Sequence, residues 1–172
     1  MATAAVETCQ PLDFGVVGIH RNPSTSDFKS SLDTYNALPD DSEQPDVGPG
    51  TLKALAEIFV RHGAHKVYGL HLVHGHSQAP QGTVMVGTTF VEEGKNMCWT
   101  KPTPVSELDE DVHGHIYQLR DGAFIPYEYR RGRLDAKFYE VNDAFFKELA
   151  TYLAVHNLAG LLGLEVLDRP RT

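Results

Sequence analysis

Residues 115–129 read HIYQLRDGAFIPYEY, and this stretch decides the class of fold. The pair Asp121-Gly122 stands between two largely apolar runs, 115–120 and 123–129. An Asp-Gly pair in this position is typical of a two-residue hairpin, because both central residues of the favoured turn adopt positive φ angles. The stretch therefore predicts two antiparallel strands joined by a tight turn.

Further strands are predicted on both sides of this hairpin. Apolar and β-branched residues bounded by turn residues mark them. The expected ranges are 66–74, 83–92, 97–100, 134–138 and, with two glycines in it, 12–20. The segment 161–167 then packs the C-terminal part of the chain back onto the body.

Two helices are predicted from apolar residues at helical spacing. Thr51 is the expected N-cap of the first helix, and Gly63 is its C-terminal stop. Asn142 is the expected N-cap of the second, which Gly160 ends. Two main helices and about six strands, mostly in hairpins, predict an α+β fold with an antiparallel curved sheet or a small barrel.

The length of 172 residues and the hydrophobic content of 41% suit a single domain over residues 1–172. Residues 21–50 are rich in Ser, Asp and Pro, so we expect a long surface loop or lid there. Phe28, Leu32 and Tyr35 have near-helical spacing within this segment, which leaves a short helix as an alternative.

The charge of the chain argues against two classes of partner. Its formal net charge is −8, so neither nucleic acid nor a membrane surface is an expected partner. No apolar run in the sequence approaches the roughly 20 residues of a membrane helix. Two cysteines, Cys9 and Cys98, are too few for a disulfide framework, and we expect a cytoplasmic protein. The sequence leaves the oligomeric state open.

Histidine is concentrated in two short segments. Residues 69–76 read GLHLVHGH, and residues 113–115 read HGH. If the first segment continues a strand, alternation places His74 and His76 on one face and His71 on the other. Imidazole is a good ligand for Zn, Fe, Cu and Ni, so a same-face pair suggests a divalent transition metal.

A catalytic metal centre needs a third protein ligand and at least one open position. The candidates are His115, His113 and Glu128, and His115 and Glu128 are also candidate catalytic groups. Two histidines with a carboxylate suit Fe(II) and O2, whereas three histidines suit Zn hydrolysis or Cu and Fe dioxygenation. In the alternative interpretation the histidines only form hydrogen bonds in the sheet, and Glu128 faces water between buried Tyr127 and Tyr129.

Part of the first histidine segment resembles the first motif of the cupin barrels. His74 and His76 match its H-x-H pair, Gly87 matches its closing glycine, and Gln81 stands where the family has Glu. The resemblance implies a small barrel with a metal held by the H-x-H pair. One histidine of residues 113–115 would then take the place of the family's later histidine.

Residues 72–76 are also similar to a segment G-x-x-L-L-H-x-H-F in small proteins of unassigned function. Residues 126–128 (PYE) and 162–164 (LGL) share this resemblance. It implies no activity, but it favours the H-x-H pair and Glu128 over His71 as site residues.

Together these patterns predict a metal-dependent enzyme whose substrate is a small organic molecule. Oxygenation with O2 at a non-heme, histidine-rich site is the first expectation, with Fe, Zn or Cu as the metal. A metal-assisted lyase or hydrolase is the second. A metal-free protein that binds a small ligand, or an accessory protein, is the alternative from another class.

Overall fold

A computed structural model describes residues 15–40, 42, 44–92, 95–108 and 111–168, with side chains described for all except 89–92 and 95–98. Across these residues there are three α-helices and six strands, with short 3-10 helices between some of them. The helices are α1 (Thr25–Asn36), α2 (Pro49–Arg61) and α3 (Asp143–Val155). The strands are β1 (Tyr68–Leu72), β2 (Thr83–Glu92), β3 (Lys95–Pro104), β4 (Val112–Arg120), β5 (Ala123–Arg131) and β6 (Leu162–Val166).

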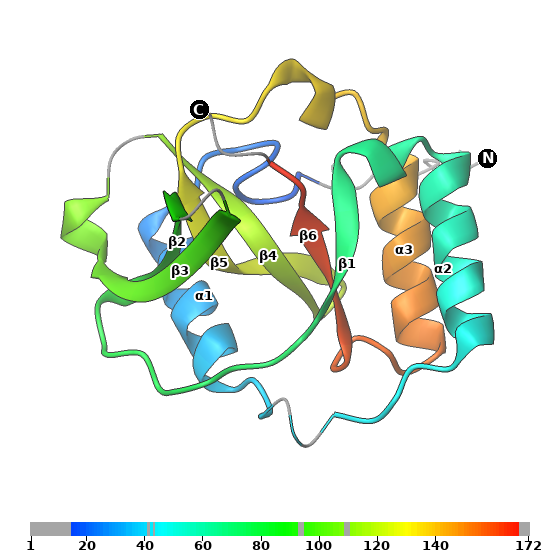
Figure 1. The fold of residues 1–172 in the computed structure, drawn as a ribbon, viewed down its shortest axis with the longest axis horizontal. Coiled ribbons are helices and arrows are strands. Elements are labelled where there is room, and N and C mark those ends of the chain that lie inside the picture. The colour runs from blue at the N-terminus through cyan, green and yellow to red at the C-terminus, as the bar shows by residue number, and fades with distance from the viewer. Residues whose placement is uncertain (1–14, 41, 43, 93–94, 109–110, 169–172) are drawn as a thin grey trace, which may run out of the picture.

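The strands form one sheet in the order β1-β6-β4-β5-β2-β3 (Figure 1). The α+β fold with a curved sheet is confirmed, and the sheet is open rather than closed into a barrel. One pair departs from the antiparallel prediction, because β2 runs parallel to β5. These two strands are neighbours in space but not consecutive along the chain, so no hairpin fixes their relative direction.

The hairpin of β4 and β5 is confirmed. Arg120 pairs with Ala123, and the two turn residues Asp121 and Gly122 have φ angles of 50° and 78°. These positive angles explain why Asp-Gly occupies the turn. The register shifts between Gly114 and Tyr117, so β4 is irregular where it carries its histidines.

The larger core lies where α2 and α3, side by side, cover the part of the sheet around β1 and β6 (Figure 1). Aromatic rings fill it: Tyr68 stacks with Phe145 at 5.9 Å between centroids, and Phe59 meets Phe145 edge-on at 4.9 Å. Along β6, Leu164 and Val166 enter this core. Strand alternation therefore turns the residue between them toward the opposite side.

Residues 21–50 are not a loop throughout, because they contain the short helix that the spacing of Phe28, Leu32 and Tyr35 had left as the alternative. Helix α1 occupies the middle of the segment and packs against β5 and β2. Its Leu32 and Tyr35 are buried, and Ser31 Oγ lies 2.6 Å from the Tyr129 hydroxyl. Helix α1 buries the polar side chains of Ser31 and Thr34 as well as apolar ones. A segment with few apolar residues can therefore still form a packed helix.

The two predicted helices are present with small changes at their ends. Asn142 caps α3, since its side chain accepts a hydrogen bond from the Ala144 amide at 2.8 Å. Helix α2 begins at Pro49, two residues before Thr51, and Gly63 beyond its end has φ +67°. No helix in the described ranges has the length and apolar content needed to cross a membrane.

Two predicted strands are wrong. Residues 134–138 do not form a strand: Ala136–Phe138 is a short 3-10 helix, and Leu134 and Phe138 are buried while Ala136 is exposed. In the other segment, residues 15–20 form a turn around Gly18, whose φ is +76°. Residues 12–14 of that prediction lie outside the described residues, as does Cys9.

Candidate functional site

The first histidine segment leaves the sheet before its H-x-H pair. Strand β1 ends at Leu72, so His74 and His76 lie in the loop that follows and not on one strand face. Their rings are nevertheless close, with centroids 4.8 Å apart and edge-on. His71 joins them, because its ring stacks on His74 at 5.3 Å. We call His71, His74 and His76 the histidine row.

Backbone contacts fix the loop that carries this row. The Val73 amide donates to the Leu161 carbonyl at 2.9 Å, and the Gly75 amide donates to the Pro39 carbonyl at 2.9 Å. Val73 is fully buried. A Cβ at Gly75 would lie 3.2 Å from Leu38 Cβ, so glycine lets the loop pack against the end of α1.

Two rings of the row have an acceptor next to Nδ1. His74 Nδ1 donates to the Leu72 carbonyl at 2.7 Å, which leaves the Nε2 lone pair of the neutral ring available. His71 Nδ1 lies 3.8 Å from Glu165 Oε2. This contact with His71 lowers the pKa of Glu165, against an opposing effect of burial, and nearby His115 contributes to the lowering.

The second histidine pair lies in a separate acid–histidine cluster, which we define as His113, His115, Arg130, Glu165 and Asp168. His115 Nε2 is 3.7 Å from Glu165 Oε1, and its Nδ1 is 3.5 Å from Asp168 Oδ1. His113 Nε2 is 3.2 Å from Asp168 Oδ2, and Arg130 Nη1 donates to Asp168 Oδ1 at 2.7 Å. Both histidines are buried.

Asp168 is the negative centre of this cluster. Burial alone raises the pKa of its carboxyl, but His113, His115 and Arg130 outweigh burial, and the pKa lies well below the usual range. The carboxylate is therefore ionised at neutral pH and holds the two histidines and the arginine together.

The structure does not bring the two histidine pairs onto one ion. His113 and His115 face carboxylates, and Glu165 lies between His115 and His71. Among the described residues, no group of three or more His, Cys, Asp and Glu side chains converges closely enough to hold a metal ion. The expectation that His113 or His115 completes the set of His74 and His76 therefore finds no support in this geometry.

Glu128 lies on β5 between two buried tyrosines and is itself half-buried. It accepts a hydrogen bond from Thr100 Oγ1 at 3.2 Å. The Tyr127 side chain is 1% exposed, and its hydroxyl makes no hydrogen bond within the described structure. Burial raises the pKa of this hydroxyl, and the carboxylates of Glu128 and Glu165 add to the effect. Among the described residues, Glu128 forms no hydrogen bond or ion pair with a histidine.

Sequence reasoning missed Glu165 and Asp168, the two carboxylates of the acid–histidine cluster. A signal for Glu165 was present, because it stands between Leu164 and Val166 in an apolar strand. Glu128, a candidate from the sequence, stands in the same way between Tyr127 and Tyr129 of an apolar strand. Asp168 lies beyond the end of β6, and no local pattern in the sequence marks it.

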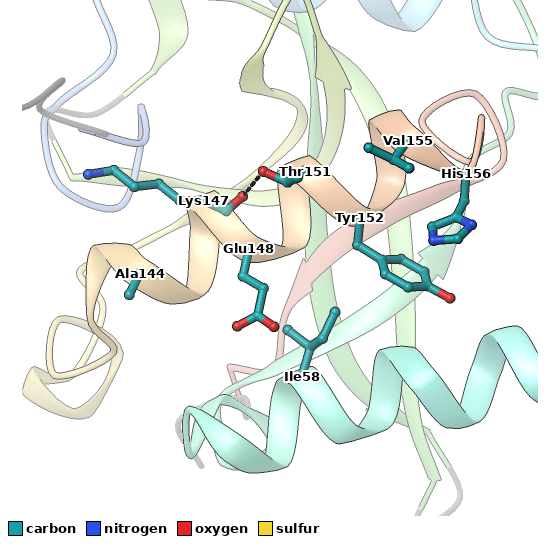
Figure 2. Close-up of a pocket in the computed structure, with 8 residues that line it drawn as sticks. All are labelled: Ile58, Ala144, Lys147, Glu148, Thr151, Tyr152, Val155 and His156. Carbon is teal, nitrogen blue, oxygen red and sulfur yellow. Dashed lines mark hydrogen bonds between the residues drawn. The ribbon is translucent and has the colours of Figure 1, made fainter.

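A separate groove lies between α2 and α3 and has a volume of about 560 Å³ (Figure 2). Glu148 and Tyr152 point toward α2, whereas Lys147 points away from it (Figure 2). Glu148 already contacts Arg61, and His62 Nε2 at 2.6 Å. The carboxylate of Glu148 is thus already paired with basic side chains. The groove therefore has fewer groups available for a ligand than the histidine row.

Comparisons with protein families, with curated proteins and with solved structures give no match for this chain. The case for a function therefore rests on the site itself.

Proposed function

We propose that the protein is a metal-dependent enzyme and that the histidine row binds a divalent transition metal, Fe, Zn or Cu. The observation that carries the proposal is the pair of acceptors at Nδ1. The Leu72 carbonyl engages His74 and the Glu165 carboxylate faces His71, as outer partners do in metal sites where Nε2 is the ligand.

The proposed ligands are His71, His74 and His76. His71 replaces the third ligand expected from the sequence, because its ring stacks on His74. His76 is exposed, so rotation of its side chain costs little packing, whereas the Leu72 carbonyl holds the half-buried His74 ring in place. We propose that rotation of His76 brings the Nε2 atoms of the three rings onto one ion, because the ring centroids already lie 5.3 Å (His71–His74) and 4.8 Å (His74–His76) apart.

Three imidazoles leave one or more positions on the metal for water, O2 or substrate. We propose oxygenation of a small organic molecule as the reaction, with metal-assisted lysis or hydrolysis as the second candidate. Glu165 orients His71 in either reaction. We propose Glu128, which is half-buried on β5, as the group that faces the substrate.

The proposal includes a small-molecule substrate and a cytoplasmic location, and it includes no nucleic acid or membrane partner. The net charge of −8 supports the exclusion of nucleic acid and membrane partners. The low count of two cysteines supports a cytoplasmic location. A metal-free ligand-binding protein is the second candidate function. The observation favouring it is that no three described ligand side chains converge on a point.

Elemental analysis of protein purified without a histidine tag tests the proposal. We expect about one equivalent of metal, and a rise in melting temperature on adding Fe, Zn or Cu, since a ligand of the folded state stabilises the fold. His74→Ala should lose the metal and keep the fold. His156→Ala is the matched control, because His156 is exposed at the end of α3. Metal retained by His74→Ala contradicts the assignment.

A further inference from the structure

A second cavity, of about 620 Å³, lies where β1 begins and β6 ends. Its wall combines Lys66 and Lys137 with groups of the acid–histidine cluster. The lining residues are His65, Lys66, His115, Arg130, Lys137, Glu165, Val166, Leu167 and Asp168. This volume is within the range of small-molecule sites, roughly 300–1,000 Å³.

The charges of this wall differ from those of the whole chain. The net charge of the chain is −8, yet three cationic side chains, Lys66, Arg130 and Lys137, meet two carboxylates here. Arg130 and His113 already engage Asp168. Within the described structure, neither lysine forms an ion pair, although the Lys137 ammonium lies 5.0 Å from the centre of the Phe138 ring. The two ammonium groups are therefore available for an anion.

A buried polar atom lies in the same wall. His115 is 4% exposed, and its Nδ1 makes no hydrogen bond to any described group. Asp168 Oδ1 lies 3.5 Å from it, a charge contact rather than a hydrogen bond. An unsatisfied buried nitrogen costs free energy, so this wall of the cavity is not explained by packing alone.

We propose that this cavity binds a small organic oxyanion, a carboxylate or a phosphate monoester. Lys66 and Lys137 neutralise the anion, and the buried Nδ1 of His115 is a polar atom of the wall that still lacks a hydrogen bond to any described group. A metal cation fits the cavity poorly, because its two carboxylates lie next to different nitrogens of His115 and three cationic side chains line it. The proposal goes beyond the metal site and does not rest on it.

Calorimetric titration of the metal-free full chain with succinate and with inorganic phosphate tests this proposal at low salt. We expect saturable binding of at least one anion, no binding of neutral succinamide, and weaker binding at high salt. The double variant Lys66→Ala, Lys137→Ala should raise the Kd by about 10-fold or more. Succinate binding without phosphate binding assigns a carboxylate, and the reverse assigns a phosphate.

The matched control is the double variant Lys29→Ala, Lys53→Ala, which removes two exposed lysines from α1 and α2. It should bind the anion like the unchanged chain. Three results overturn the proposal: no binding of either anion at about 10 mM, binding that the cavity variant leaves unchanged, or an equal loss in the control. Each of these results leaves the proposed metal site unaffected, because no metal is present in the titration.

Discussion

The two sides of the β1–β6 region differ in what their side chains contribute. On the side of α2 and α3, Leu164 and Val166 enter an apolar core. On the other side, Glu165 lies between His71 and His115. One strand thus supplies packing on one side and ionisable groups on the other, because successive side chains of a strand alternate.

The energetics of the two sides differ as well. Fully burying one large apolar side chain stabilises a fold by roughly 1.5–3 kcal/mol, so Phe146 and Leu149 contribute directly to stability. Buried ion pairs give much less net stability, because the lost hydration of both charges offsets their attraction. The acid–histidine cluster is therefore poorly explained by stability alone.

Truncation of the apolar core is expected to have the largest effect on folding. Phe146 is fully buried and contacts Tyr68, Phe124 and Phe145 edge-on. Phe146→Ala should lower the free energy of unfolding by about 3–5 kcal/mol, through lost burial and the cavity left behind. Denaturant titration measures the change. A loss below about 1 kcal/mol would show that α3 does not pack on the sheet as described.

Replacement of Gly114, the glycine of the second H-G-H motif, is expected to have the next largest effect on stability. A Cβ at Gly114 would lie 2.0 Å from the Tyr117 hydroxyl, which donates to the Val17 carbonyl at 2.9 Å. Gly114→Ala should cost about 1–3 kcal/mol of stability through overpacking. Gly160→Ala is the control, since a Cβ there meets nothing within 4 Å. Equal stability of the two variants would refute the close approach.

Asp168 is expected to make the stability of the fold depend on pH. Its pKa is lowered in the fold, so its ionised form stabilises the protein above the unfolded pKa of about 3.9, and this contribution is lost as the pH falls below that value toward the folded pKa. Asp168→Asn should cost about 2 kcal/mol at neutral pH and less in acid. Unfolding curves between neutral and acid pH measure this, and a loss that does not shrink in acid argues against the cluster.

Glu165→Gln tests the ionisable role of β6 separately from its packing role. Of the four variants, it is expected to change stability least. The amide keeps the shape of the carboxylate but removes the charge that faces His71. Metal affinity should fall by about 10- to 100-fold, as for other outer partners of ligand histidines. Competition with a chelator of known affinity measures it. If affinity is unchanged while stability falls, Glu165 is a structural residue only.

Much of the fold could be predicted because its signals are local. The Asp121-Gly122 turn, the Asn142 cap and the range of β2 all follow from residues next to one another. The parallel β2–β5 pair depends on contacts between distant segments, which no local pattern specifies.

The site was predicted less well than the fold for the same reason. The rings of His74 and His76 lie next to each other, but in a loop held by Leu161 and Pro39, far away in the sequence, and not on the predicted strand face. The partners of His115 come from β6 and the segment after it, so spacing alone could not show that carboxylates engage this ring.

The most direct test of the account is X-ray absorption at the metal edge of the Zn-loaded protein. The histidine row predicts three imidazole nitrogens at about 2.0–2.1 Å from zinc, and two in His71→Ala. A spectrum without imidazole scattering, or one that His71→Ala leaves unchanged, would contradict the claim that these three rings share one ion.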